Sequence, residues 1–350
     1  MRPVRDVSIA MALCLAVAAP GAFAGPKDTR NAATKDTTIA VANEHATSLQ
    51  FFDLNTGKLL KDIPTLRRPH EMVIDPATSL AYVSIAYQDG PFSAYEKPGN
   101  QIQVIDLQNM AITNTIDITP HWAPHGLAFD AKDGILYASC ESNGGELIGV
   151  DIKQMKVVAA VKLGVPHPHT VAVVPSLEKA YTANKDVQHI SVVHLRSCEV
   201  SEIPAPTGTE GIIATADGRY VFAGNQTGKD LLVIDPAKDV VVKRVPLDLP
   251  PSTFALAPDG SKLYITFWHM GAGTTFNNEG YIQELDIATL KPGPKLAVGH
   301  FPLNMTVASN GKIGVVDTTA DGEIAVVNLA QMKITRKIKT DEWPHGILVY

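Results

Sequence analysis

The apolar positions of this chain fall in short runs, which are separated by Gly, Pro, Asn and Asp. Residues 135–140, 147–151 and 156–161 are three such runs, and Val, Ile, Leu and Ala dominate them. Asp133-Gly134 and Asp217-Gly218 stand between runs and are typical of hairpin turns. Runs this short and this rich in β-branched residues predict strands rather than helices. We therefore expect an all-β protein.

The runs repeat with a period of about 45 residues, four runs to a unit. Units of four short antiparallel strands are typical of β-propeller blades. They begin at seven positions: Pro69, Pro124, Pro168, Thr209, Pro251, Pro302 and Pro344. The sequence thus predicts a seven-bladed β-propeller with four-stranded antiparallel blades. The chain enters on a second strand (38–43) and leaves on a first strand (345–350). The C-terminal strand is therefore expected to join the first blade and close the ring, which removes exposed sheet edges.

Several units also carry the motifs of a known family. Ala180-Tyr181-Thr182-Ala183-Asn184 stands where that family has Tyr-Val-Thr-Asn, and residues 103–107, 233–236 and 257–264 match its other segments. Over residues 37–350 the chain resembles the YVTN family of seven-bladed propellers and is similar to the periplasmic YncE-like proteins. The resemblance implies the fold and little about activity, because one propeller family hosts many roles.

The first residues have the features of a secretory signal peptide. Arg2 and Arg5 precede an apolar run at 9–19, and Ala22-Phe23-Ala24 forms a cleavage signal. The run is too short to span a bilayer. We therefore expect a signal peptide (1–24), a disordered linker (25–36), a propeller domain (37–350), a periplasmic location and no membrane span. An ordinary N-terminal helix and a lipidated Cys14 are the alternatives.

Composition narrows the choice of partners. Apolar residues make up 45% of the chain, and its formal charge is −6 without a basic run. An apolar core of this size stabilises a fold without cross-links, and Cys140 and Cys198 are too few for a disulfide framework. The charge gives no basis for a nucleic-acid surface. We expect a monomer whose partner is a small-molecule ligand or a periplasmic protein.

Four histidines occupy one position in the repeat, directly after the proline that opens a unit: His70, His125, His169 and His345. The equivalent residues of the other units are Glu210, Ser252 and Leu303. The first strand of each propeller blade lines the central channel, so these side chains are expected at one mouth of the channel. The histidines and Glu210 come from five consecutive blades of the closed ring.

Neutral imidazoles with a carboxylate are ligands that transition metals prefer. The pattern therefore predicts that the four histidines bind a divalent transition metal (Fe, Cu, Zn or Mn). Glu210 is then the catalytic general base or a fifth ligand. A second interpretation is that Pro-His is an inherited turn, in which each ring hydrogen-bonds a neighbouring backbone carbonyl.

Two loops between second and third strands, 87–100 and 268–280, are longer than their equivalents and are expected at the same mouth. Both contain aromatic residues, and a neighbouring entry loop adds a histidine and a tryptophan. Exposed aromatic side chains favour a binding role. The predicted substrate or lid residues are Tyr87, Tyr95, His121, Trp122, Trp268 and His269.

Three functions agree with these features. The first is metal-dependent small-molecule chemistry of the lyase or oxidoreductase type. The second is a non-catalytic YncE-like module that binds a periplasmic protein, a glycan or another ligand. The third is a redox accessory that binds haem or a quinone. The sequence has no Gly-rich phosphate loop, His-Glu-x-x-His, Gly-x-Ser-x-Gly or Cys-x-x-Cys-His motif, so nucleotide, serine-hydrolase and covalent-haem chemistry have no support.

Overall fold

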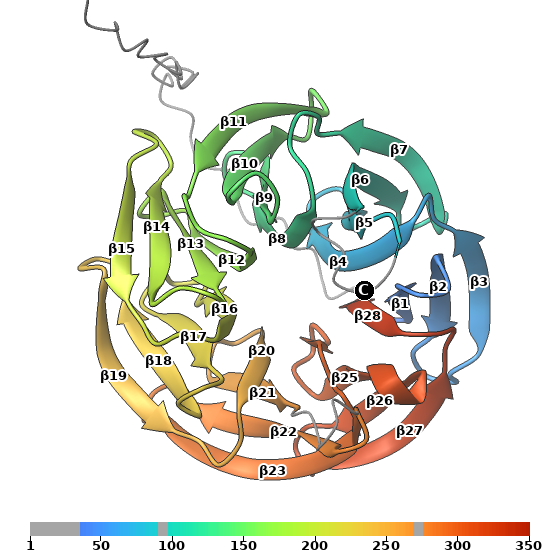
Figure 1. Cartoon of the computed structure of the whole chain (residues 1–350). Coiled ribbons are helices and arrows are strands. Elements are labelled where there is room, and N and C mark those ends of the chain that lie inside the picture. The colour runs from blue at the N-terminus through green and yellow to red at the C-terminus, as the bar shows by residue number, and fades with distance from the viewer. Residues whose placement is uncertain (1–35, 90–96, 269–275) are drawn as a thin grey trace, which may run out of the picture.

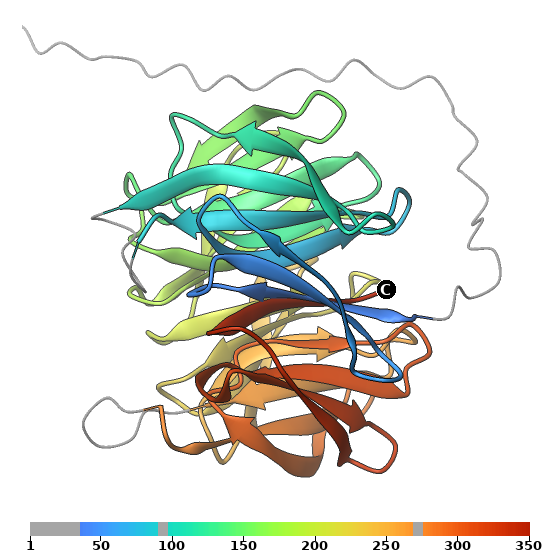
Figure 2. The same ribbon diagram turned by 90° about the vertical axis from the view of Figure 1, so that its right-hand side faces the viewer.

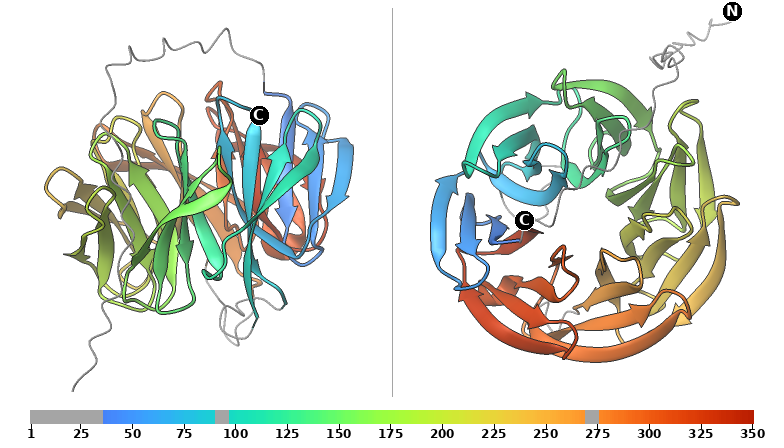
Figure 3. Two further views of the ribbon diagram at one scale, coloured as in Figure 1. Left: turned by 90° about the horizontal axis from the view of Figure 1, so that it is seen from above. Right: turned by 180° about the vertical axis from the view of Figure 1, so that it is seen from behind.

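The computed structural model describes residues 36–89, 97–268 and 276–350. Its strands form seven four-stranded antiparallel sheets, arranged as blades around a central axis (Figure 1). The view from behind shows the same ring, and the view from above shows it edge-on (Figure 3). The predicted all-β seven-bladed propeller is therefore confirmed. The predicted signal peptide and all of the predicted linker except its last residue lie outside the described residues. A search of the described residues found no helix that could span a membrane.

Each blade is named here after its innermost strand, and its strands follow from the axis outward. The first three blades contain β28 (Pro344–Val349), β1 (Thr38–Asn43), β2 (Ser48–Asp53) and β3 (Leu59–Pro64); β4 (Arg68–Asp75), β5 (Leu80–Tyr87), β6 (Pro98–Asp106) and β7 (Ala111–Asp117); and β8 (Pro124–Asp130), β9 (Ile135–Cys140), β10 (Glu146–Asp151) and β11 (Lys156–Lys162). The next two contain β12 (Pro168–Val174), β13 (Lys179–Asn184), β14 (His189–His194) and β15 (Val200–Pro204); and β16 (Thr209–Ala214), β17 (Val221–Asn225), β18 (Asp230–Asp235) and β19 (Val240–Pro246). The last two contain β20 (Pro251–Leu256), β21 (Lys262–Phe267), β22 (Glu279–Asp286) and β23 (Lys291–His300); and β24 (Met305–Val307), β25 (Ile313–Thr318), β26 (Glu323–Asn328) and β27 (Lys333–Lys339), with the 3-10 turn η1 (Thr319–Asp321).

The two ends of the described chain close the ring. Strand β28 pairs antiparallel with β1, with Ile39 opposite Val349 and Val41 opposite Ile347. Figure 2 shows the red C-terminal strand lying against the blue first strands. The predicted completion of the first blade by the C-terminal strand is therefore confirmed. It follows that the β28 and β4 blades are neighbours, although their innermost strands lie at opposite ends of the chain.

The hydrophobic core lies between neighbouring blades. One cluster joins Tyr181 and Ile190 of the β12 blade to Ile212 and Val221 of the β16 blade. Strands in the middle of a blade are covered on both faces, so β17 is buried at every position, whereas the outer strand β3 is mostly exposed. This burial explains why the apolar runs of the middle strands are continuous rather than alternating.

Each histidine-bearing inner strand begins with an irregularity that positions the candidate site. In the β8 blade, Pro124 pairs with Cys140 and Leu127 pairs with Ala138, so the inner strand carries an extra residue at His125 and Gly126. The same shift occurs in the β12 blade between Pro168 and Val171. Such bulges re-aim a side chain. The repeated bulge thus places the residue after each proline at the channel mouth.

Candidate functional site

The four predicted histidines form one arc at the mouth of the channel. The ring centroids of His345 and His70 are 3.9 Å apart, those of His70 and His125 are 4.1 Å apart, and those of His125 and His169 are 4.0 Å apart. All four side chains are buried. Residues that are far apart in the sequence are therefore in direct contact. This contiguous group is called the histidine arc below.

Buried hydroxyl groups on the second strands fix the spacing of the arc. The Ser84 hydroxyl accepts a hydrogen bond from the Glu71 amide at 3.1 Å and donates to the His125 carbonyl at 3.1 Å. The Ser139 hydroxyl likewise accepts from the Gly126 amide at 3.0 Å and donates to the His169 carbonyl at 2.5 Å. Each serine thus connects the bulge of its own blade to the histidine of the next blade.

Glycines follow His125 and His345 and allow neighbouring blades to approach closely at the arc. A Cβ atom on Gly126 would lie 2.6 Å from the Thr170 Cα and 2.7 Å from the His169 carbonyl oxygen. A Cβ atom on Gly346 would lie 2.5 Å from the His70 carbonyl oxygen. These distances are far inside van der Waals contact and involve backbone atoms. The Pro-His-Gly sequence therefore combines a mouth-facing side chain with the space for the next blade.

Two buried glutamates complete the site, and the sequence did not predict either of them. Glu44, His70 and His345 form one group whose candidate ligand atoms lie within 4.8 Å of one another. His125, Glu141 and His169 form a second group with the same limit. Each glutamate follows the last residue of a second strand, β1 or β9. That register position is the signal that sequence inspection could have used.

Burial keeps the imidazoles neutral. It lowers the pKa of His70, His125 and His169 well below the usual value, and the charge of Lys185 contributes to each shift. Burial, assisted by Lys185, lowers the pKa of His345 to about 3. Neutral imidazole is the form that binds a metal. The arc is therefore in its ligating protonation state at neutral pH.

The hydrogen bonds of the rings differ along the arc. His169 Nδ1 lies 3.1 Å from the carbonyl oxygen of Glu210, as the inherited-turn interpretation requires. A neutral ring that donates from Nδ1 presents a lone pair at Nε2. Within the described residues, Nδ1 of His70 and Nδ1 of His125 are buried without a hydrogen-bond partner. The turn interpretation thus accounts for His169 and leaves these two rings unexplained.

The carboxylates of the two groups have different neighbours. The Tyr87 hydroxyl donates a hydrogen bond to Glu141 at 2.8 Å, and Glu141 Oε1 lies 3.9 Å from His125 Nε2. Glu44 lies 3.8 Å from the Arg68 guanidinium. Burial raises the pKa of each glutamate to about 7. A positive ligand at either group would favour the ionised carboxylate.

Glu210 belongs to a neighbouring set of contacts rather than to either group. Its carboxylate accepts a hydrogen bond from the Ser252 hydroxyl at 3.3 Å, and Ser252 accepts one from the Trp268 indole at 2.8 Å. Burial raises the pKa of Glu210, while the charge of Lys185 opposes the rise. Leu303, the remaining residue at this register, is buried and apolar. The catalytic role of Glu210 stays a prediction.

The other predicted lid residues take different places. Tyr87 is buried in the site, and Trp268 also contacts Phe301. His121, in the loop before β8, has Nδ1 2.7 Å from Glu146 Oε2 at the start of β10. This contact attaches His121 to the β8 blade. Trp122 is half-buried. Tyr95 and His269 lie outside the described residues, so their predicted role is not addressed by the structure.

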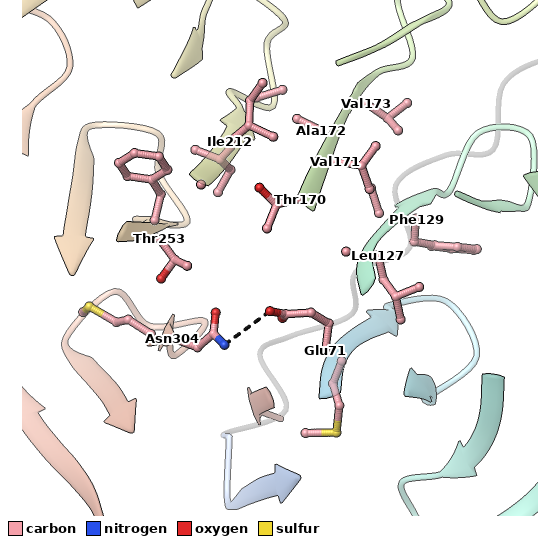
Figure 4. A pocket seen from close by; sticks show the side chains of 18 of the residues that line it. Glu71, Leu127, Phe129, Thr170, Val171, Ala172, Val173, Ile212, Thr253 and Asn304 are labelled. Atoms are coloured by element: carbon pink, nitrogen blue, oxygen red, sulfur yellow. Dashed lines mark hydrogen bonds between the residues drawn. The ribbon is translucent and has the colours of Figure 1, made fainter. Parts of the chain in front are cut away.

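An axial cavity adjoins the histidine arc, and Figure 4 shows the side chains that line it. Its volume is about 340 Å³, and its walls come from the inner strands of the ring. Glu71 and Asn304 line it and also contact the arc, with Glu71 Oε1 at 3.7 Å and Asn304 Nδ2 at 3.2 Å from His345 Nδ1. The arc and the cavity therefore form one continuous site.

Comparison with known proteins agrees with the fold. No protein-family model matches the chain. YncE of Salmonella typhimurium is 25% identical over 218 residues, which cover 61% of this chain and 58% of that protein. YncE of Salmonella typhi matches equally well. The chain is a distant homologue of YncE. YncE is described as uncharacterized, and the match spans less than two thirds of its length, so the YncE relationship assigns no activity.

Solved structures show the same architecture. A putative 6-phosphogluconolactonase from Bacteroides fragilis has a TM-score of 0.71 at 15% identity, and the match covers 91% of this chain and 98% of that chain. Hydrazine synthase from Kuenenia stuttgartiensis has a TM-score of 0.66 at 15% identity, with coverage of 79% and 88%. Likeness at 15% identity shows the propeller fold alone.

Proposed function

We propose that this protein is a periplasmic, metal-dependent enzyme that acts on a small molecule at the channel mouth. The observation that carries the proposal is the buried group of His125, Glu141 and His169, whose candidate ligand atoms lie within 4.8 Å of one another. Two imidazoles and one carboxylate form the donor set of catalytic zinc sites and of non-haem iron sites. Such a set leaves coordination positions open for water or substrate.

The surroundings of this group support metal binding. The carbonyl oxygen of Glu210 is hydrogen-bonded to Nδ1 of His169, which leaves Nε2 available to a metal. The Tyr87 hydroxyl donates a hydrogen bond to the carboxylate of Glu141. Contacts of this kind orient metal ligands in proteins. The group of Glu44, His70 and His345 has the same donor types, but the Glu44 carboxylate already pairs with the Arg68 guanidinium at 3.8 Å, whereas the Glu141 carboxylate accepts a hydrogen bond from the neutral Tyr87 hydroxyl. We therefore assign the principal metal to His125, Glu141 and His169, with His70 and His345 extending the site.

The remaining polar residues give the site its chemistry. A divalent transition metal bound there supplies Lewis acidity and lowers the pKa of a bound water. Lys185 follows β13, and its charge acts on all four imidazoles and on Glu141 and Glu210, so it attracts an anionic group of a substrate. Glu210, whose pKa is raised, serves as the general acid or base. This arrangement suits a lyase or oxidoreductase reaction.

Elemental analysis tests the proposal directly. Full-length protein, secreted to the periplasm of a bacterial host and purified without chelators, is expected to contain about one transition-metal ion per chain. Dialysis against EDTA should remove the ion, and adding it back should raise the melting temperature. A metal-free protein whose melting temperature ignores zinc, copper, iron and manganese would contradict the proposal.

The Glu141→Gln variant distinguishes two effects of Glu141 on stability: the cost of ionising a buried carboxyl group and the stabilisation gained by binding a metal. The pKa of Glu141 is about 7 in the folded protein, above its ordinary value of 4.5. The free energy of unfolding therefore has its full contribution from protonated Glu141 below pH 4.5 and loses it as the pH rises through 7. Without metal, the variant should therefore gain about 2–3 kcal/mol over the wild type between pH 5 and pH 8. With zinc at pH 8 the order should reverse. Urea denaturation at both pH values, with EDTA or zinc, measures this.

The opposite result would count against the assignment. If the metal-free variant loses stability relative to the wild type as pH rises, Glu141 is already ionised and paired in the protein. If zinc stabilises both proteins equally, Glu141 is not a ligand. Glu202→Gln on β15 is the matched control, because the Glu202 side chain is 63% exposed. It should change neither comparison.

A binding function is the second candidate, and an aromatic cluster at the same mouth favours it. Phe301 contacts Trp268, Phe276 and Trp343, and Trp343 stacks on His45 with centroids 4.5 Å apart. Trp268, Phe276 and Trp343 are half-buried, so their ring faces are available to a glycan or a protein partner. A metal-free protein that retains such a ligand would support this function instead.

A further inference from the structure

Most side chains that line the axial cavity are apolar. Four are polar and are called the collar here: Glu71, Thr170, Thr253 and Asn304. Figure 4 shows Glu71 and Asn304 pointing toward one another, with Thr170 and Thr253 on the facing blades. The rest of the wall is glycine and apolar side chains, among them Leu127, Phe129, Val171, Ile212 and Ile347. A cavity of about 340 Å³ lies within the size range of small-molecule sites.

The two threonines of the collar have already used their donor hydrogens. The Thr170 hydroxyl donates to the carbonyl oxygen of Glu210 at 2.6 Å. The Thr253 hydroxyl donates to the carbonyl oxygen of Leu303. A hydroxyl has one donor hydrogen and two acceptor lone pairs. Both threonines therefore offer only acceptors to a ligand in the cavity.

Asn304 and Glu71 likewise offer acceptors to a ligand in the cavity. The amide nitrogen of Asn304 donates to Glu71 Oε1 at 3.4 Å and to the His345 carbonyl at 3.1 Å, which uses both of its hydrogens. Its carbonyl oxygen remains as an acceptor. The carboxylate of Glu71 is an acceptor, and from the described residues it receives only the long bond from Asn304 and a contact at 3.7 Å with His345. The collar thus presents oxygen acceptors on several sides.

The described wall of the cavity has no cationic side chain beside the Glu71 carboxylate. Neither Lys nor Arg is among the lining residues in the part of the chain that the structure describes. Asp317 lies behind the collar and accepts the amides of Leu303 and Asn304 at 2.6 and 3.0 Å, which adds a second buried carboxyl group on this side. A ligand that matches the collar therefore brings several N–H donors and a positive charge, and most of the side chains around its body are apolar.

We propose that the axial cavity binds a primary amine with an apolar body, with its ammonium group in the collar of Glu71, Thr170, Thr253 and Asn304. An ammonium group carries three donors and no acceptor, which complements a collar of acceptors. The alkyl or aryl body lies against the inner strands, where burial of apolar area favours it. This inference uses residues that the metal proposal does not, so each can fail without the other.

Titration calorimetry with n-hexylamine, 1-hexanol and hexanoate tests the proposal on the purified full-length protein. We expect n-hexylamine to bind about 10- to 100-fold more tightly than 1-hexanol, because a hydrogen bond to a charged group replaces a neutral one. Hexanoate should not displace n-hexylamine, because the Glu71 carboxylate repels a carboxylate from the collar. Glu71→Gln should reduce amine affinity to that of the alcohol, while the exposed control Glu202→Gln should leave it unchanged. Melting temperatures confirm that each variant is folded.

The other outcomes overturn the proposal. Equal binding of amine and alcohol would mean that the collar does not select a cation, and this comparison needs no variant. Unchanged amine affinity in folded Glu71→Gln would place the amine elsewhere. Amine binding that disappears in His125→Ala/His169→Ala but persists in Glu71→Gln would show direct ligation to a metal. In the proposed arrangement, amine affinity survives the loss of those two histidines.

Discussion

Replacing His125 and His169 together with alanine is expected to abolish metal binding. The two imidazoles supply two of the three donors of the principal group, and the remaining carboxylate of Glu141 cannot hold a transition metal alone. Metal content should fall from about one ion per chain to below about one tenth of that value. A metal present at 100 times its Kd raises the free energy of unfolding of the wild type by about 2.7 kcal/mol, and this stabilisation should disappear in the double variant. Elemental analysis and thermal melts with and without zinc measure both effects.

The matched control carries two histidine replacements on a different strand. His189 and His194 lie on β14, the third strand of the β12 blade, away from the inner strands that form the arc. The double alanine variant at these positions should keep the metal content of the wild type. If both double variants retain the metal, the histidine arc is structural. If both lose it, loss of folding rather than loss of ligands explains the result.

Gly126→Ala is expected to damage both the fold and the site. The added Cβ atom would lie 2.6 Å from the Thr170 Cα and 2.7 Å from the His169 carbonyl, so two neighbouring blades must separate. The φ of Gly126 is not positive, so the missing space alone opposes alanine. We expect a loss of about 3 kcal/mol in the free energy of unfolding and a weaker metal site, because the shift moves His125 relative to His169. Urea denaturation and zinc titration measure the two effects.

Gly293→Ala provides the comparison for this substitution. Gly293 lies on the outer strand β23, where an added Cβ atom would meet the flexible Glu284 side chain at 3.2 Å. This variant should stay within about 0.5 kcal/mol of the wild type and bind zinc normally. A Gly126→Ala protein as stable as Gly293→Ala would mean that the blades tolerate separation at the arc. The close spacing of the histidines would then have another cause.

Much of the fold followed from local sequence features. Short β-branched runs, Asp-Gly turns and a repeat of about 45 residues are sufficient to predict blades, because strand length and turn geometry are local properties. The incomplete unit at each end predicted the pairing of β28 with β1. The Pro-His register also predicted which histidines meet. Those four lie in one arc because the ring is closed and every blade repeats the same bulge.

The carboxylates of the site could not be read from the sequence in the same way. Glu44 and Glu141 occupy a turn position where the other blades have different residues, such as Lys185 and Trp268. Only the packing of adjacent blades shows that these turns face the arc. Glu210, in contrast, shares the register of the histidines, yet its carboxylate turns to Ser252. Register determines where a backbone lies and does not determine the direction of a long side chain.

The sequence by itself therefore determined the ring, its closure and the meeting of His345, His70, His125 and His169, because these depend on a periodic backbone. The tertiary structure alone decided how the rings divide into two groups with Glu44 and Glu141, and which acceptor oxygens of the collar around Glu71 remain free. Those properties depend on side-chain direction and on contacts between blades. Such contacts join residues that no local pattern connects.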